Sequence, residues 1–322
     1  MGRVEEVATR PRVGLVVGDP SGIGPEVLAK TLALPATLAA CRAFVIGDAR
    51  IIARGAEAAG VSLPPRVQVM DLKNCPPEEV AVGRATARTG KAAGEALEFA
   101  VRMAQHGDLD GIVYAPLHKR ALHDAGYGFE DELHLLAHWL GCEEFGEINV
   151  LDELWTSRVT SHIGLARVAR ELSVERVLAA IRLIHRERRR AGTERPLIAV
   201  AAFNPHAGEG GLFGREEEAI IAPAVACARA EGIECDGPIP ADTVFVRARL
   251  REFDAVVTMY HDQGQIAMKL LGFERGVTLA GGLPVPIATP AHGTAHDIAG
   301  RGVANSGAFQ AALHLAVRMA AR

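Results

Sequence analysis

Short apolar runs alternate with segments of helical periodicity along most of the chain, and this alternation constrains the fold more than any other feature. Strand-like runs are predicted at residues 12–17, 43–46, 67–70, 111–114, 148–151, 159–161, 197–202 and 255–259. Helical spacing is predicted at 26–34, 91–105, 174–190, 216–230 and 307–321. Strands that alternate with helices usually form parallel sheets covered by those helices. The sequence therefore predicts a mainly parallel α/β fold.

The composition agrees with a large aliphatic core. Hydrophobic residues make up 49% of the 322 residues, but aromatic residues only 5%. A core of Ala, Val, Leu and Ile suits parallel strands beneath Ala-rich helices. The length allows two domains or one large α/β unit.

Charge and cysteine content exclude several classes of protein. The formal net charge of -4 argues against nucleic-acid binding, which needs a dense basic surface. Five scattered cysteines without a Cys-x-x-Cys pair predict neither a disulfide framework nor a thiolate zinc site. No apolar run is long enough to span a bilayer, and Met1–Arg12 lacks the apolar stretch of a secretory signal. We therefore expect a cytoplasmic protein without a membrane partner.

Three histidines follow predicted strands and form a candidate metal site. His162 follows the run at 159–161, His206 follows 197–202, and His261 follows 255–259. Imidazole is a common ligand of divalent transition metals, and a three-imidazole site with an open position polarises a substrate oxygen. The spacing leaves open the alternative that each histidine is an ordinary hydrogen-bonded residue.

Three other polar residues are candidates for contact with a substrate or for proton transfer. Asp242 can orient a ligand, or it can be the N-cap of the following helix. Lys269 lies in an otherwise apolar helical segment, where it either binds a substrate carboxylate or extends to solvent. Lys119 follows the predicted strand at 111–114 and is a third candidate for the general base.

A glycine-rich segment at residues 292–305, called the nucleotide loop below, is a candidate dinucleotide site. The chain lacks the Gly-x-Gly-x-x-Gly spacing of the Rossmann fold, which excludes that fold class. Asp297 in the loop can accept hydrogen bonds from a ribose diol, and its charge would repel a 2′-phosphate. The loop therefore favours NAD over NADP, although Asp297 can also be a helix N-cap.

Several motifs resemble those of the 4-hydroxythreonine-4-phosphate dehydrogenase family of pyridoxal phosphate biosynthesis. The resemblance runs from about Val13 to the C-terminus and is carried by the segments 18–26, 204–209, 240–243 and 260–264. The nucleotide loop is also similar to the adenosine-binding loop of isopropylmalate and isocitrate dehydrogenases. Its candidate cofactor contacts are His292, Gly293, Thr294, Asp297, Ile298 and Asn305.

The resemblance implies two α/β domains with an active-site cleft between them, in a homodimer. Residues 1–130 and 272–322 would form a discontinuous dinucleotide-binding domain, and residues 131–271 a domain for metal, substrate and dimerisation. The resemblance implies a divalent metal (zinc, magnesium, manganese or cobalt) held by His162 and His206 of one subunit and His261 of the other. Asp242 and Lys269 would contact the substrate, a hydroxy acid that is oxidised by NAD(P) and then loses carbon dioxide.

Four positions depart from the family pattern. Glu132 and Leu133 stand where the biosynthetic enzymes have a His-Thr pair, and Thr278 and Ile287 stand where those enzymes have an Asn and an Arg. These four side chains offer no cation to a phosphate. We therefore expect an unphosphorylated 3-hydroxy acid, for example a carboxylated cis-dihydrodiol like the substrate of the terephthalate-pathway enzyme in the same family.

Three alternatives stay open from the sequence. The first is the same chemistry on 4-phosphohydroxythreonine, with Arg120 or Arg275 binding the phosphate. The second is a metal-dependent hydrolase or lyase that uses no nucleotide. The third is a binding protein without catalytic activity.

Overall fold

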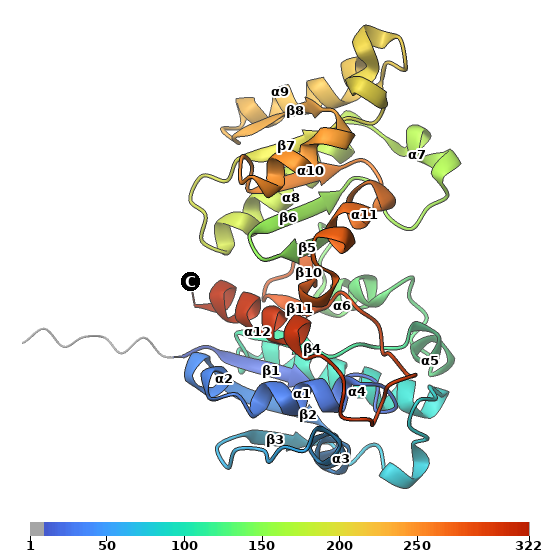
Figure 1. Ribbon diagram of the computed structural model, residues 1–322, viewed down its shortest axis with the longest axis vertical. Coiled ribbons are helices and arrows are strands. Elements are labelled where there is room, and N and C mark those ends of the chain that lie inside the picture. The colour runs from blue at the N-terminus through green and yellow to red at the C-terminus, as the bar shows by residue number, and fades with distance from the viewer. Residues whose placement is uncertain (1–9, 322) are drawn as a thin grey trace, which may run out of the picture. The chain divides into compact units, whose positions relative to one another are not determined.

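The structure is a computed structural model that describes residues 10–321, and the chain in it forms two compact units. The first unit comprises Met1–Glu130, Val285–Ile287 and Gly293–Arg322, and the second comprises Asp131–Pro284 and Ala288–His292. Figure 1 shows the first unit in blue and cyan, with the red C-terminal helix returning to it. Residues 1–9, which include most of the segment expected to lack a secretory signal, lie outside the described residues.

The first unit has a parallel sheet. Its strands lie in the order β3-β2-β1-β4, and each neighbouring pair is parallel. The elements of this unit are β1 (Arg12–Val16), α1 (Gly24–Leu32), α2 (Pro35–Ala40), β2 (Arg42–Gly47), α3 (Ala49–Ala59), β3 (Gln68–Asp71), η1 (Pro77–Glu79), α4 (Ala87–Gln105), β4 (Gly111–Tyr114), α5 (Lys119–Asp124) and α12 (Gly307–Ala320). The four strands predicted in this part of the sequence are all present within a residue or two.

Helix α4 packs closely on its neighbours because its buried face is built from alanine and glycine. Ala96 and Ala100 are fully buried. A Cβ atom at Gly90 would lie 2.0 Å from the Ala121 carbonyl oxygen, and one at Gly94 would lie 2.1 Å from the Tyr127 ring. Any side chain at these two positions would therefore force the helix away from its neighbours.

Helix α4 also begins earlier than the sequence predicts, at Ala87 rather than Lys91. The Thr86 hydroxyl accepts a hydrogen bond from the Thr89 backbone N–H at 3.2 Å, and the Thr89 hydroxyl accepts one from the Thr86 N–H at 3.1 Å. This reciprocal pair is a capping box, with threonine in the place usually taken by glutamate or glutamine. The predicted start of this helix at Lys91 was therefore wrong.

The second unit has a mixed sheet, with strands in the order β11-β10-β5-β6-β9-β7-β8. The pairs along β11-β10-β5-β6 are antiparallel, and those along β6-β9-β7-β8 are parallel. The elements are α6 (Glu132–Leu140), β5 (Gly146–Leu151), β6 (Leu154–Arg158), α7 (Leu165–Glu171), α8 (Val174–Arg190), β7 (Ile198–Ala201), η2 (Pro205–Gly211), η3 (Glu217–Ile221), α9 (Ala222–Ala230), β8 (Cys235–Ile239), α10 (Ala241–Arg249), β9 (Ala255–Thr258), α11 (His261–Gly272), η4 (Phe273–Arg275), β10 (Val277–Gly281) and β11 (Ile287–Pro290). The second domain was expected to end at residue 271. Because β10 pairs with β5, the second unit instead includes residues beyond 271.

Strand β6 corrects the prediction of a strand at residues 159–161. The strand ends at Arg158, and its partner β5 precedes it across a tight turn in which Asp152 has a positive φ of 53°. Trp155 is fully buried, and Thr156 and Ser157 are nearly so. Polar residues buried on a central strand remove the apolar pattern on which the sequence prediction depended.

Helix α3 is capped by a buried carboxylate that also holds the following loop. The Asp48 side chain accepts hydrogen bonds from the backbone N–H groups of Arg50 at 3.0 Å and Cys75 at 2.9 Å. The Arg50 guanidinium, 2.8 Å from Asp48, together with these N–H groups lowers the pKa of Asp48 to about 2. The charged form of Asp48 is therefore the one that stabilises the fold.

This cap gives a pH-dependent prediction. Because the folded-state pKa is lowered, the stabilisation is fully present above the unfolded pKa of about 3.9 and is lost as the pH falls toward 2. Asp48→Ala is expected to lower the free energy of unfolding by about 1 kcal/mol at pH 7, and by less at pH 3. Urea unfolding at both pH values tests this, with the exposed Asp124→Ala as control. An equal loss at both pH values would contradict the role of the charge.

Two further predictions from the sequence concern thiols and membranes. All five cysteines are free thiols, as expected. Burial raises the pKa of Cys41 and of Cys75 to about 11. Across residues 10–321, no helix combines the length and the apolar character that crossing a bilayer would need.

Candidate functional site

The three candidate metal ligands follow three neighbouring parallel strands of the second unit. Strand β9 lies between β6 and β7 and is parallel to both. His162 comes shortly after β6, His206 shortly after β7, and His261 is the first residue of α11 after β9. Since the carboxyl ends of parallel strands meet at one edge of a sheet, the fold places the three histidines at the same edge.

Within one chain, the structure brings two of these histidines together. The ring centroids of His162 and His261 are 5.7 Å apart. His206 is exposed, and its ring lies 6.1 Å from that of Phe213. Within the described part of a single chain, no group of three or more His, Cys, Asp or Glu side chains is arranged to hold a metal ion.

The surroundings of these rings fit metal ligation. His261 Nδ1 lies 2.6 Å from Asp262 Oδ1, and a hydrogen bond donated there leaves the Nε2 lone pair for a ligand. His162 Nδ1 lies 3.6 Å from Asp131 Oδ2. A carboxylate beside the non-ligating nitrogen fixes the orientation of the ring and makes the other nitrogen a stronger metal ligand. The donor set therefore suits a divalent metal of the zinc type.

Asp131 is a residue of this site that the sequence analysis missed. Its Oδ1 accepts a hydrogen bond from the His134 backbone N–H at 2.9 Å, which caps helix α6, and lies 2.6 Å from His134 Nδ1. Its other oxygen faces His162. An aspartate three residues before a helical histidine is a recognisable N-cap signal, and it stands next to the two departures from the family pattern.

The loop that carries His206 is held in an unusual backbone conformation. Residues 206–210 all have positive φ, between 44° and 81°, and three of them are not glycine: His206, Ala207 and Glu209. Such a conformation is unfavourable for residues with a Cβ and persists only where the surroundings enforce it. Strain of this kind often marks a functional loop.

A buried carboxylate holds the segment that leads into this loop, and the sequence analysis missed it as well. Glu217 is 3% exposed and accepts hydrogen bonds from the backbone N–H groups of Phe203 at 2.8 Å and Asn204 at 2.6 Å. It also accepts one from the Asn204 side-chain amide at 2.9 Å. Glu217 thus fixes the point where the His206 loop leaves strand β7.

Gln263 connects the ends of strands β7 and β9. Its Oε1 accepts a hydrogen bond from the Met259 N–H at 2.7 Å, and its Nε2 donates one to the Ala202 carbonyl at 2.7 Å. Both groups of the carboxamide are occupied by backbone. Gln263 therefore holds the start of helix α11 and with it His261.

Lys269 lies in the last turn of α11 and lines a small, mainly apolar pocket of the second unit, about 20 Å³ in volume. The pocket is also lined by Asn149, Gln265, Gly276 and Ala291. Asn149 accepts hydrogen bonds from Gln265 at 2.7 Å and Arg158 at 3.0 Å, and its amide lies 3.4 Å from the Thr278 hydroxyl. Two predicted substrate residues, Lys269 and Thr278, are therefore close to one polar network.

The other predicted substrate and catalytic residues lie in different places. Asp242 is exposed in the first turn of α10, whose N-cap is Pro240, so its alternative role as N-cap was wrong. Lys119 is the exposed first residue of α5. Glu132 and Leu133 are half-buried at the start of α6. Ile287 is fully buried, so the structure does not support its predicted contact with substrate.

In the first unit, the nucleotide loop leaves Asp297 open to solvent. The Asp297 side chain is exposed, whereas Thr294 is buried and Ile298 half-buried. Helix α12 begins only at Gly307, with Ser306 as N-cap, so the alternative that Asp297 caps a helix was wrong. An exposed carboxylate on a fixed loop can reach a ribose diol. Of the remaining candidates in the loop, His292 is half-buried, and Gly293 and Asn305 are exposed.

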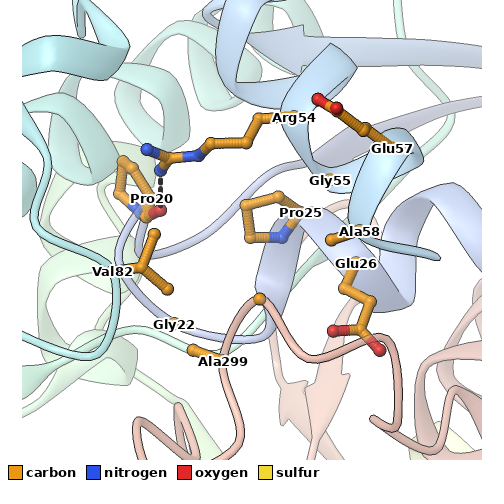
Figure 2. A pocket seen from close by; sticks show the side chains of 11 residues that line it. Pro20, Gly22, Pro25, Glu26, Arg54, Gly55, Glu57, Ala58, Val82 and Ala299 are labelled. Carbon is orange, nitrogen blue, oxygen red and sulfur yellow. Dashed lines mark hydrogen bonds between the residues drawn. The ribbon is translucent and has the colours of Figure 1, made fainter.

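A cavity of about 420 Å³ in the first unit adjoins this loop (Figure 2). Ala299 and Gly300 of the loop line it, opposite Pro25 of α1 and Ala58 of α3. Arg54 also lines the cavity and donates a hydrogen bond to the Pro20 carbonyl at 2.8 Å (Figure 2). Burial lowers the pKa of Arg54.

The chain matches known proteins along almost its whole length. Residues 39–316 match the family described as pyridoxal phosphate biosynthetic protein PdxA. A Pseudomonas aeruginosa protein named "Putative 4-hydroxythreonine-4-phosphate dehydrogenase 2" is 49% identical over 96% of this chain and 97% of its own. The D-threonate 4-phosphate dehydrogenase of Cupriavidus necator is 40% identical over 97% of this chain and 98% of its own.

Solved structures agree with the fold. A 4-hydroxythreonine-4-phosphate dehydrogenase from Klebsiella pneumoniae is 38% identical, with a TM-score of 0.86 over 98% of this chain and 100% of its own. A terephthalate 1,2-cis-dihydrodiol dehydrogenase from Burkholderia xenovorans is 29% identical, with a TM-score of 0.68 over 96% of this chain and 98% of its own. An isocitrate dehydrogenase from Methylococcus capsulatus, 17% identical with a TM-score of 0.50 over 97% of this chain and 88% of its own, shares the fold alone. The predicted fold class is thereby confirmed.

These names contradict the prediction of an unphosphorylated substrate. The two relatives and the Klebsiella enzyme are named for phosphorylated compounds. The prediction relied on four side chains without a cation: Glu132, Leu133, Thr278 and Ile287. It was wrong because backbone N–H groups and cations elsewhere on a chain can also bind phosphate.

The relatives are dehydrogenases, which implies a nicotinamide cofactor and, for this family, a divalent metal. The predicted family resemblance is confirmed by a match that covers most of the sequence. The chain belongs to the family of the pyridoxal phosphate biosynthetic protein PdxA.

Proposed function

We propose that this protein oxidises a 4-phosphorylated, four-carbon 3-hydroxy acid with NAD, with a divalent metal bound by His162, His206 and His261. The observation that carries the proposal is the position of these three histidines after three neighbouring parallel strands. The names of the relatives supply the substrate class, which includes 4-phosphohydroxythreonine and D-threonate 4-phosphate. Both compounds carry a carboxylate at C1, a hydroxyl at C3 and a phosphate at C4.

In the proposed reaction the C3 hydroxyl loses its proton and C3 transfers a hydride to the nicotinamide ring. The product is a 3-keto acid, which then loses carbon dioxide. When bound, a divalent metal stabilises negative charge on the substrate oxygen. Lys269, Asp242 and Lys119 are the candidates for holding the transferred proton.

The second unit offers two cations for the anionic ends of the substrate. Lys269 lines the small pocket beside Asn149, and Arg275 precedes Gly276, which lines the same pocket. Arg275 Nη2 lies 3.2 Å from Asp152 in an exposed ion pair, and such pairs are weak enough to exchange a partner. Arg120, in the first unit, is also paired at the surface, with Asp124 at 2.7 Å. We therefore propose Lys269 and Arg275 as the cations that bind the phosphate and the carboxylate.

A homodimer is part of the proposal. The second unit exposes several large apolar side chains, which are Leu165 at 69%, Leu212 at 73%, Ile266 at 59% and Leu270 at 83% exposed. Ile266 and Leu270 lie one turn apart on helix α11 and so share one of its faces, and a contiguous exposed apolar face commonly marks a protein interface. A second copy of the chain would cover them and would let each subunit contribute a histidine to the metal site of the other.

The test is NADH formation with a divalent metal present, followed by absorbance. We expect turnover of 4-phosphohydroxythreonine or of D-threonate 4-phosphate, which differ at C2, where one has an amine and the other a hydroxyl. D-threonate without phosphate is the matched control and should react at least about a hundredfold more slowly. Equal rates with and without the phosphate would contradict the proposed substrate class.

The nucleotide preference can be changed at Asp297. Its exposed carboxylate would repel the 2′-phosphate of NADP and accept hydrogen bonds from the ribose of NAD. Asp297→Ala is expected to raise KM for NAD about tenfold and to reduce the discrimination against NADP by a similar factor. Steady-state kinetics with both nucleotides measure this. If the native enzyme uses NAD and NADP equally well, the role proposed for Asp297 is refuted.

A further inference from the structure

The segment Thr294–Ala304 of the nucleotide loop is bound to the loop after strand β1 and to helix α1 at several points, all inside the first unit. The Ile23 backbone N–H donates a hydrogen bond to the Thr294 carbonyl at 3.0 Å. A Cβ atom at Gly22 would lie 2.8 Å from the same carbonyl oxygen. The close contact at Gly22 shows that the two loops pack backbone against backbone.

A buried carboxylate holds the ring of His296, the residue next to Asp297. Asp19 is 1% exposed, and its Oδ2 lies 3.1 Å from His296 Nε2. Its Oδ1 accepts hydrogen bonds from the Ser21 N–H at 2.9 Å and the Ser21 hydroxyl at 2.8 Å. Both oxygens of Asp19 are therefore used, one to fix its own loop and one to bind His296.

The face of the His296 ring is also fixed. It stacks on His118, with ring centroids 5.4 Å apart and an angle of 27° between the planes. His118 is itself held, because its Nδ1 accepts a hydrogen bond from the Ala121 N–H at 3.2 Å. The His296 ring is thus positioned at its edge by Asp19 and on its face by His118.

A second attachment lies on the other side of Asp297. Glu26 is 2% exposed and accepts hydrogen bonds from the N–H groups of Gly302 at 3.2 Å and Ala304 at 2.7 Å. Lys30 donates to the carbonyls of the same two residues, at 2.9 and 2.8 Å, and pairs with Glu26 at 2.8 Å. Asp297 therefore lies between two attachments, neither of which involves its own side chain.

We propose that Asp19 and His296 are positioning residues for the dinucleotide, which hold the loop so that Asp297 meets the ribose without a prior rearrangement. The inference rests on the proposed function, because it assigns the ribose to Asp297. A loop that is ordered before binding loses less conformational freedom when the nucleotide arrives, so the attachment acts on affinity. The attachment does not act on the hydride step, because His296 contacts Asp19 and His118 and touches none of the reacting atoms.

The experiment compares three variants in the full chain. His296→Leu removes the hydrogen bond to Asp19 and places an apolar side chain of similar size in the same position. His296→Gln keeps a donor that can reach the carboxylate. His123→Leu is the control, because His123 is 70% exposed on helix α5. NAD affinity is measured by calorimetric titration, kcat at saturating NAD by NADH formation, and protection of the loop amides by hydrogen exchange without nucleotide.

We expect His296→Leu to raise Kd and KM for NAD about tenfold, to change kcat less than about twofold, and to speed exchange of the loop amides. His296→Gln should recover most of the affinity, and His123→Leu should match the native protein. Unchanged NAD affinity in His296→Leu overturns the inference while leaving the proposed function intact. So does a fall in kcat with KM unchanged, which would place His296 at the reacting atoms. A native protein that binds no NAD overturns both.

Discussion

Replacing His206 by alanine is expected to reduce turnover by about a thousandfold or more while leaving NAD affinity within about twofold of the native value. Loss of one of three imidazole ligands removes the metal's stabilisation of the substrate oxygen, which is worth several kcal/mol, and each 1.4 kcal/mol is a factor of ten in rate. NAD binding should persist because the nucleotide loop belongs mainly to the first unit and His206 to the second. NADH formation and calorimetric NAD titration measure the two effects separately.

The control for this variant is His138→Ala, which removes an exposed imidazole from helix α6 of the same unit. It should retain native turnover. Bound metal, measured by elemental analysis after dialysis, should fall in His206→Ala and not in His138→Ala. Native activity in His206→Ala would refute the three-histidine site.

A large loss of kcat/KM is also expected when the charge of Lys269 is removed. Lys269→Met keeps the length and apolar stem of the side chain but removes the ammonium group beside the Asn149 network. If Lys269 binds an anionic end of the substrate, kcat/KM for the phosphorylated acid should fall about a hundredfold, which corresponds to about 2.7 kcal/mol. NAD affinity should not change.

Two further variants serve as controls for Lys269→Met. Lys269→Arg keeps the charge and should lose less activity than Lys269→Met. Lys91→Met removes another exposed lysine, on helix α4, and should have native kinetics. A Lys269→Met enzyme with unchanged kcat/KM would show that the lysine only extends to solvent, which is the alternative that the sequence left open.

Part of the parallel region was predictable because several of its strands are apolar on both faces, although the parallel strand β8 (Cys235–Ile239) was missed. Strand β4 and strand β9 are buried at every residue, and such runs are visible in a single sequence. His206 and His261 follow such strands, β7 and β9, whereas His162 follows β6, whose apolar pattern is interrupted. Helix α8 also begins at Val174 after Ser173, as its capping serine predicts.

Strands β6 and β10 of the antiparallel part were not predictable in this way. Strand β6 buries Thr156 and Ser157, and strand β10 has the half-buried Thr278 at its second position, so neither shows a continuous apolar run. The buried acids Asp19, Glu26 and Glu217 were equally hidden. Each has partners that are distant in sequence: the His296 ring for Asp19, and backbone N–H groups for Glu26 and Glu217. A sequence pattern carries no information about such partners.

The left-handed run at residues 206–210 has a consequence for anyone who selects heat-stable variants of this enzyme. Ala207 and Glu209, at φ values of 54° and 44°, have a higher conformational free energy than glycine would have in the same place. Selection for heat resistance alone would therefore favour glycine in this loop. Those same changes would widen the range of orientations open to the neighbouring imidazole, so resistance to heat and rate of turnover are expected to trade against each other here.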